Sequence, residues 1–147
     1  MTMRINFDMD GTIANLYGVE NWLEMLIAKD ETPYAIAKAL VNLSLLARYL
    51  NKIQKKGVEI AVISWLSKNS TKEYDEKVTN AKLNWLAKHL PSVNWDNVEI
   101  VPYGTPKERF CFTENDILFD DEEQNRNNWK GFAYKETEIF TVLKSIA

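Results

Sequence analysis

Short apolar runs alternate with amphipathic segments along the chain, and this alternation predicts a parallel β-sheet covered by helices. Each run is brief and bounded by polar or turn-forming residues, as is typical of a buried strand. The expected strands cover residues 4–8, 59–64, 98–101 and 117–120, with a weaker candidate at 132–134. The predicted fold class is therefore α/β, a doubly wound parallel sheet in one domain that spans residues 1–147.

Helical spacing of the apolar residues predicts that helices fill the segments between these strands. We expect helices over residues 19–29, 33–56, 71–90 and 137–146. Thr32 and Pro33 supply a cap and a first position for the second of these helices, and Gly57 stops it. The sequence Ser70-Thr71-Lys72-Glu73 has the form of a capping box for the third helix.

Composition limits the classes of function that the chain can serve. Lys and Arg total 18 and Asp and Glu total 21, and no basic cluster typical of a nucleic-acid-binding protein is visible in the sequence. The single cysteine, Cys111, excludes a disulfide within the chain, and the single histidine, His89, lies at a predicted helix end. No apolar stretch is long enough for a membrane span or a targeting segment, so we expect a cytoplasmic protein without a membrane partner.

Three of the predicted strands end in residues that can bind a metal ion or a phosphate, and the carboxyl ends of parallel strands share one edge. The first strand leads into Asp8-Met9-Asp10-Gly11-Thr12, where a period of two places both aspartates on the same side. Gly11 allows a sharp turn close to a bound group. Another strand leads into Asp120-Asp121, and adjacent carboxylates favour magnesium, which prefers oxygen ligands.

Paired carboxylates of this kind suit phosphate chemistry. A carboxylate that attacks a phosphate must overcome the repulsion between two anions, and a divalent cation held between them removes it. The second carboxylate can then protonate the leaving oxygen and later activate water. The alternative interpretations are two solvated aspartates in a glycine turn and an acidic loop that continues through Glu122 and Glu123.

Two further residues could complete an anion site. Ser64 ends the second strand, where its hydroxyl and the adjacent backbone amides can donate to a phosphate oxygen. Lys107 follows Thr105-Pro106, which can cap a helix and direct its first-turn lysine towards the same site. The alternatives are a serine that only ends a strand and a lysine on the surface. The rival lysines are Lys82, Lys88 and Lys130.

These elements, in this order, resemble the four motifs of the haloacid dehalogenase-like phosphatases, and the resemblance extends from residue 4 to about residue 125. It implies that Asp8 is the nucleophile, that Asp10 is the general acid/base and that Lys107 is the catalytic cation. It also implies a magnesium site, with Asp10 contributing its backbone carbonyl. The predicted magnesium ligands are Asp8, Asp10, Asp120 and Asp121, and the predicted phosphate- or substrate-binding residues are Gly11, Thr12, Ser64 and Trp65.

The short connection after the first strand leaves room only for a minimal helical cap, so we expect a small lid at about residues 14–31 and a fairly open site. Tyr17 and Trp22 in this lid, and Trp65, could stack on a base or sugar or pack in the core, and the sequence favours neither. The stretch 120–125, followed by Trp129-Lys130-Gly131, is loosely similar to small 5′-nucleotidase-like members of the family.

The leading hypothesis is a magnesium-dependent phosphomonoesterase that acts through an aspartyl-phosphate, with a nucleotide or another phosphorylated small molecule as substrate. The second hypothesis is a phosphate-sensing or partner-binding module with the same fold and little turnover. The third is a phosphotransferase, because transferases and hydrolases share the aspartyl-phosphate. The sequence does not determine which substrate is used or whether the chain forms oligomers.

Overall fold

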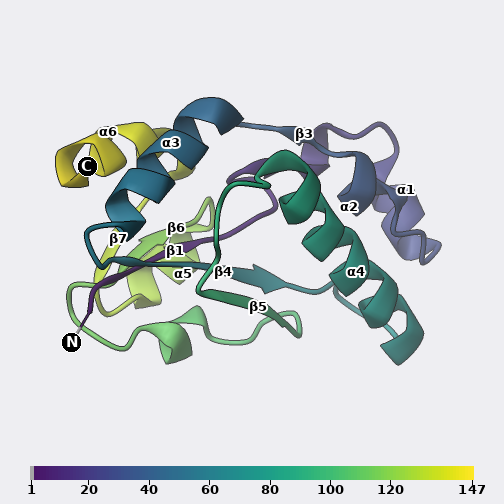
Figure 1. Cartoon of the computed structure of the whole chain (residues 1–147). Helices are drawn as coiled ribbons and strands as arrows, with labels where there is room; N and C mark the ends of the chain where they lie inside the picture. Colours follow the sequence, from purple (N-terminus) through teal and green to yellow (C-terminus); the bar gives the residue numbers. More distant parts are fainter. Residues whose placement is uncertain (1) are drawn as a thin grey trace.

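A five-stranded parallel sheet forms the centre of the computed structural model, which describes residues 2–147 (Figure 1). The strands are β1 (Arg4–Phe7), β4 (Glu59–Trp65), β5 (Asn97–Val101), β6 (Ile117–Phe119) and β7 (Phe132–Tyr134). Their order across the sheet is β5-β4-β1-β6-β7, and each neighbouring pair is parallel. All five strands expected from the sequence are therefore confirmed, and so is the α/β class.

The helices are short except for two. The α-helices are α1 (Trp22–Ile27), α2 (Thr32–Ile36), α3 (Leu43–Gln54), α4 (Lys72–His89), α5 (Glu123–Asn128) and α6 (Ile139–Ile146). The 3-10 helices are η1 (Leu16–Gly18), η2 (Lys107–Phe110) and η3 (Glu136–Glu138). A small antiparallel pair joins β2 (Ala14–Asn15) to β3 (Lys38–Ala39).

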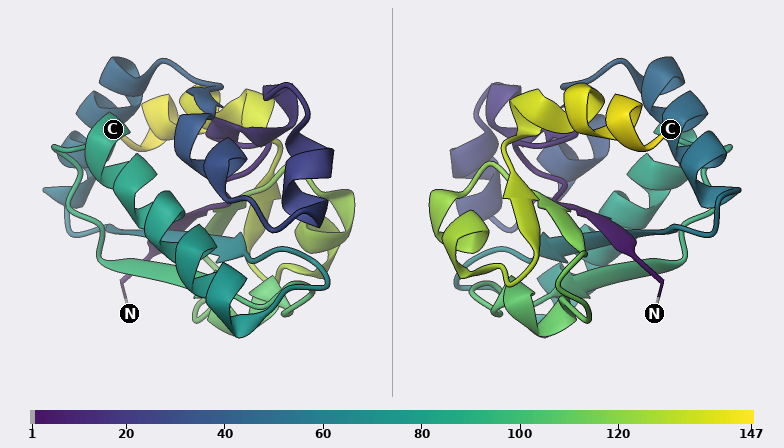
Figure 2. Two further views of the ribbon diagram at one scale, coloured as in Figure 1. Left: turned by 90° about the vertical axis from the view of Figure 1, so that its right-hand side faces the viewer. Right: turned by 90° about the vertical axis from the view of Figure 1, so that its left-hand side faces the viewer.

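The two faces of the sheet have different covers. Helices α3, α4 and α6 lie on one side, and η2 lies on the other (Figures 1 and 2). On the first side, Phe7 and Val62 pack in the main core with residues such as Leu50 of α3. On the second side, Ile63 and Leu118 pack with Trp129 in a smaller cluster. Alternate strand residues therefore enter different cores, as the period of two in a strand requires.

The single helix expected over residues 33–56 is wrong, because the structure divides it into α2 and α3. The chain leaves the helical conformation at Ala37, whose ψ is 136°. Strand β3 then pairs with β2, which removes this stretch from any helix. The side chain of Asn42 accepts a hydrogen bond from the backbone amide of Leu45 (3.0 Å) and begins a new helix. This Asn cap was the sequence signal that apolar periodicity concealed.

The expected capping box at the start of α4 is also wrong by one position. Thr71, rather than Ser70, is the N-cap, and its hydroxyl oxygen accepts from the backbone amide of Tyr74 (3.2 Å). Because Tyr74 stands where the box needs a carboxylate or amide side chain, the reciprocal hydrogen bond is impossible. The apolar face predicted for this helix is confirmed, since Tyr74, Val78 and Trp85 are buried.

Within residues 2–147, the structure contains no helix that is both long enough and apolar enough to cross a membrane.

A buried carboxylate fixes the start of β1 relative to β6. Asp116, which is 1% exposed, accepts hydrogen bonds from the backbone amide of Arg4 (3.0 Å) and from that of Phe112 (2.9 Å). It also accepts from the amide and the hydroxyl of Thr113, at 3.1 and 2.8 Å. The other ends of β1 and β6 lead to Asp8 and Asp120, so Asp116 aligns the two strands that carry the acidic residues.

We expect Asp116→Ala to lower the free energy of unfolding by about 3 kcal/mol, because it leaves several donors without their charged acceptor. Asn115→Ala, at the exposed neighbouring position, is the matched control and should change it by less than about 0.5 kcal/mol. Chemical denaturation of both variants measures the difference. Equal stability of the two variants would contradict the alignment role of Asp116.

Candidate active site

Three carboxylates converge at the carboxyl ends of β1 and β6. Asp8, Asp120 and Asp121 each offer an oxygen that lies within 4.8 Å of the others. The parallel register pairs Phe7 with Phe119, and the amide of Asp8 donates to the carbonyl of Phe119 (2.9 Å). Residues more than 100 positions apart in the chain are therefore side by side, as the strand-end motifs predicted.

Lys107 neutralises part of this acidic cluster. Its Nζ, which is buried, donates to Asp8 Oδ1 (2.8 Å) and to Asp120 Oδ2 (2.7 Å). Burial alone would lower the pKa of this lysine, but the two carboxylates more than offset burial and raise the pKa above its ordinary value. The contact with Asp8 distinguishes Lys107 from its sequence rivals. The helix expected after Pro106 is the short 3-10 helix η2, which has no side-chain cap.

The remaining negative charge makes the cluster a suitable site for a divalent cation. Burial, with the charge of Asp8 as the next cause, raises the pKa of Asp121 to about 8. Burial and Asp8 also raise the pKa of Asp120 to about 6, although Lys107 opposes the shift. Buried carboxylates that repel one another bind protons or a cation, and magnesium prefers carboxylate oxygens. The donor set therefore fits a magnesium-type ion.

Gly11 and Thr12, in the turn after β1, lie directly beside the carboxylates of the cluster. Thr12 is buried, and its hydroxyl donates to Asp8 Oδ2 (3.0 Å) and lies 3.5 Å from Asp121 Oδ1. Gly11 has a φ of +83°, and a side chain there would overlap the carboxyl group of Asp121. Thr12 therefore holds the carboxylates by hydrogen bonds, Gly11 leaves room for Asp121, and contact of either residue with a substrate stays a prediction.

Asp8 and Asp10 border one cavity, but their carboxyl groups have different cationic partners. Strand β1 ends at Phe7, and the carbonyl of Met9 accepts hydrogen bonds from three amides that follow it. This tight turn ends the alternation and directs Asp10 to Lys82, at 2.9 Å. Burial raises the pKa of Asp10 above its ordinary value, and the charge of Lys82 opposes that shift. The carboxyl group of Asp10 lies outside the three-carboxylate cluster, and the expected metal contact of its carbonyl stays a prediction.

Lys82 is the residue that sequence reasoning undervalued, since it was considered only as a rival of Lys107. It is 1% exposed, and its ammonium group donates three hydrogen bonds. It donates to Asp10 Oδ2 (2.9 Å), Ser64 Oγ (2.7 Å) and the carbonyl of Trp65 (2.6 Å). A signal was available, because position 82 lies four residues after Val78, on the apolar face of α4.

The two residues at the end of β4 have different environments. Ser64 is fully buried beside Lys82, on the side of the sheet that α4 covers, so its expected role in binding phosphate stays a prediction. Trp65 points to the other side, donates from Nε1 to the carbonyl of Thr105 (2.8 Å) and lines the cavity described below. Asn125, which the sequence did not single out, donates to Asp120 Oδ2 (3.2 Å) and lines the same cavity.

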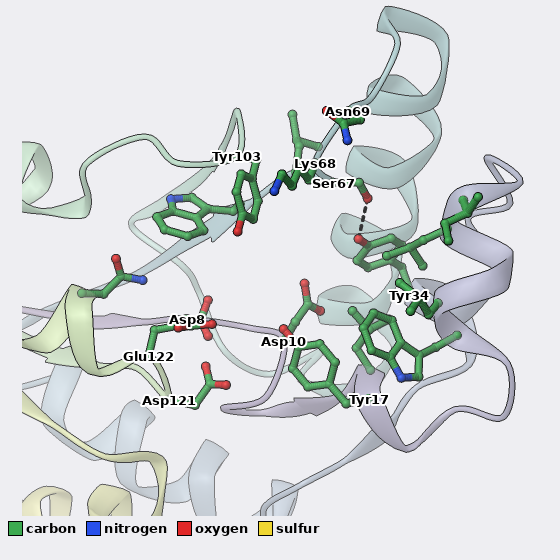
Figure 3. A pocket seen from close by; sticks show the side chains of 18 of the residues that line it. Asp8, Asp10, Tyr17, Tyr34, Ser67, Lys68, Asn69, Tyr103, Asp121 and Glu122 are labelled. Atoms are coloured by element: carbon green, nitrogen blue, oxygen red, sulfur yellow. Dashed lines mark hydrogen bonds between the residues drawn. The ribbon is translucent and has the colours of Figure 1, made fainter.

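A cavity of about 490 Å³ opens beside the acidic cluster (Figure 3). Asp8, Asp10, Asp121 and Glu122 line its acidic end. Tyr17, Trp22 and Trp65 also line it, so these aromatic residues face the cavity rather than a closed core. Tyr17 and Trp22 pack edge to face, with ring centroids 4.9 Å apart. The burial of Tyr17, together with the nearby acidic residues, raises the pKa of its hydroxyl, which therefore stays protonated.

The wall opposite the acidic residues is formed by η1, α1 and α2, here called the cap segment (residues 16–36). Three hydrogen bonds anchor it to the loop after β4 and to α4. Lys29 Nζ donates to the carbonyl of Asn69 (2.7 Å), the hydroxyls of Tyr34 and Ser67 lie 2.6 Å apart, and the Tyr74 hydroxyl donates to the carbonyl of Asp30 (3.0 Å). The small cap is thus tied down on the side of β4.

No protein-family model matches this chain, and no curated protein sequence matches it. Among solved structures, the chain is similar to a D,D-heptose 1,7-bisphosphate phosphatase from Burkholderia thailandensis, with a TM-score of 0.52 and 12% identity over 86% of this chain and 70% of that one. It is also similar to a chain in a Pnkp1/Rnl/Hen1 complex, with a TM-score of 0.56 and 15% identity. That match covers 91% of this chain but only 45% of the other.

At these identities the similarity establishes the fold. The chain shares the α/β fold of these two solved structures and has a small cap, as the resemblance to haloacid dehalogenase-like phosphatases predicted.

The raised pKa of Asp121 predicts how the binding of a divalent cation at the acidic cluster would depend on pH. Between its ordinary value of 3.8 and about 8, this carboxyl holds a proton in the folded protein that the unfolded chain releases. The stability of the metal-free protein should therefore fall as pH rises through that range. Magnesium competes with the proton, so thermal unfolding should show a larger increase in Tm with magnesium at pH about 8.5 than at pH about 5.5. Asp121→Asn should reduce that difference, and an equal increase in Tm at both pH values would contradict the assignment.

The three contacts of Lys82 predict a structural effect. Lys82→Met keeps the length of the side chain but leaves Asp10 and two oxygens of β4 without their donor. We expect the free energy of unfolding to fall by about 3 kcal/mol. Lys88→Met, at an exposed position of the same helix, should change it by less than about 0.5 kcal/mol. Denaturant titration compares the two variants, and similar midpoints would show that the contacts of Lys82 contribute little.

Proposed function

We propose that the chain is a magnesium-dependent phosphomonoesterase and that Asp8 is its nucleophile. One observation carries this proposal: the side chain of Asp8 borders the cavity while a buried lysine and two further carboxylates surround it. Such an arrangement is expected where an anionic nucleophile must approach an anionic phosphate. The fold shared with a D,D-heptose 1,7-bisphosphate phosphatase supports the same reaction class.

In this proposal the residues of the chain divide the reaction between them. Asp8 Oδ1 is held by Lys107 and Oδ2 by Thr12, which fixes the carboxylate for attack on phosphorus. The attack forms an aspartyl-phosphate on Asp8 and releases the alcohol, which needs a proton. Asp10 borders the same cavity, and burial raises its pKa, which favours a carboxyl that can supply this proton and later accept one from water.

Two charged groups would stabilise the transferred phosphoryl group. Lys107 provides a buried positive charge beside Asp8. A magnesium ion held by Asp8, Asp120 and Asp121, with the carbonyl of Asp10, would supply electrostatic stabilisation of the phosphoryl oxygens. Asp121 borders the cavity, whereas Asp120 is fully buried and accepts hydrogen bonds from Lys107, Asn125 and the amide of Glu122. Asp120 therefore has more hydrogen-bond partners within the protein than Asp121.

The substrate is proposed to be a phosphorylated small molecule, and the residues proposed to contact it or its phosphate are Gly11, Thr12, Ser64 and Trp65. Trp65 has the most direct support, because its side chain borders the cavity and its ring centroid lies 5.4 Å from Lys107 Nζ. A nucleoside 5′-monophosphate is the narrower candidate that the acidic motif at 120–125 suggested, and the aromatic residues of the cavity could stack on its base.

The proposal predicts phosphate release from a generic aryl phosphate in the presence of magnesium and its loss when magnesium is chelated. Asp8→Asn should lower kcat by about a thousandfold or more, because the amide cannot act as the nucleophile. Glu123→Gln is the matched control, since it removes a negative charge from an exposed position close to the site. A colorimetric phosphate assay measures both variants. Retention of most of the activity by Asp8→Asn would refute the mechanism.

A further inference from the structure

The cavity beside Asp8 is much larger than a phosphate group. Its volume of about 490 Å³ lies in the range of pockets that hold small organic ligands, about 300 to 1,000 Å³. A phosphate that reacts with Asp8 would occupy only the acidic end. The rest of the cavity extends along the cap segment, where the labelled Tyr34 lies away from the cluster of Asp8 and Asp121 (Figure 3). This part of the cavity is therefore available to the leaving group of the ester.

The wall formed by the cap segment is apolar. Besides Lys29 and Tyr34, it contributes to the cavity the mainly apolar residues Leu16, Tyr17, Trp22, Leu23, Leu26 and Ile27. None of the residues of α1 is buried, and Leu23 and Ile27 are 50% and 71% exposed. Apolar side chains on a short helix lose nothing in packing when a ligand covers them, and the burial of their surface favours binding. The apolar side of α1 is therefore exposed to the cavity and is not covered by other side chains of the protein.

Several polar groups near this wall are already engaged with the protein. The hydroxyl of Tyr34 is paired with that of Ser67 at 2.6 Å, and Lys29 Nζ donates to a backbone carbonyl at 2.7 Å. The indole N–H of Trp65 donates to the carbonyl of Thr105. A ligand with many hydroxyl groups would have to replace these hydrogen bonds or lose its own to water. An apolar ligand has no such requirement.

We propose that the apolar side of the cap segment, from Leu16 to Ile27, is a leaving-group subsite, and that the chain prefers phosphate monoesters of aromatic or aliphatic alcohols over those of polyhydroxylated alcohols. This inference rests on the proposed phosphatase function. It adds the chemical class of the alcohol, which neither the acidic motifs nor the fold determines.

The test compares esters of primary alcohols that differ in polarity. We expect kcat/KM for 2-phenylethyl phosphate to exceed that for glycerol 3-phosphate at least tenfold, because the phenyl ring is removed from water in the subsite. A preference below about twofold for the phenylethyl ester over glycerol 3-phosphate would overturn the assignment.

Variants of the exposed residues connect the preference to the cap segment. Leu23→Asp and Ile27→Asp should each reduce the ratio of the two kcat/KM values, phenylethyl ester over glycerol ester, by about fivefold or more. Leu83→Asp is the matched control, because Leu83 is an exposed leucine, 42% accessible, on α4 and outside the cavity lining. It should leave both kcat/KM values unchanged. An unchanged ratio in both cap variants would overturn the proposal.

A binding measurement separates the subsite from the chemistry. Calorimetry with magnesium present should show that 2-phenylethylphosphonate, which cannot be hydrolysed, binds at least tenfold more tightly than 2-hydroxyethylphosphonate. If no ester is hydrolysed, the phosphatase proposal fails, but this difference in affinity would still support the subsite. Equal affinities, or no binding of either phosphonate, would overturn the subsite whatever the outcome of the activity assay.

Discussion

The arrangement of the site depends on electrostatic repulsion among three carboxylates that two neighbouring strands bring together. Asp8, Asp120 and Asp121 have oxygens within 4.8 Å of one another, and one buried lysine offsets only part of their charge. The cluster therefore favours a further positive charge, whether protons or a divalent cation. Neighbouring donors offset part of this repulsion: the hydroxyl of Thr12 donates a hydrogen bond to Asp8, and the side-chain amide of Asn125 donates one to Asp120.

Two buried lysines divide the site into two parts. Lys107 bridges Asp8 and Asp120 on one side of the sheet, and Lys82 bridges Asp10 to the end of β4 on the other. Asp8 and Asp10 are only two positions apart in sequence, yet the turn at Met9 gives them different cationic partners. Each carboxyl therefore has its own electrostatic environment, which is what distinct roles as nucleophile and proton donor require.

The cap segment is the part of the molecule that differs most in character from the rest. It is short, its helix α1 has no buried residue, and hydrogen bonds at residues 29–34 anchor it beside α4. Leu16 and Tyr34 of the cap segment pack in a small core cluster with α4, whereas the apolar residues of α1 border the cavity that begins at Asp8. In the proposed function, the acidic residues at the sheet edge carry the reaction, and the cap segment is the part proposed to select among substrates.

The sequence alone determined the five strands, the α/β class and the convergence of Asp8, Lys107, Asp120 and Asp121, because strand patterns and strand ends follow local rules of alternation and turn chemistry. It could not predict the break between α2 and α3, since a cap at Asn42 and pairing with β2 override helical periodicity. Nor could it assign Lys82 to Asp10 or direct the apolar side of α1 into the cavity. Those features arise from contacts between segments distant in the chain, and only the folded arrangement determines which charged or apolar groups meet.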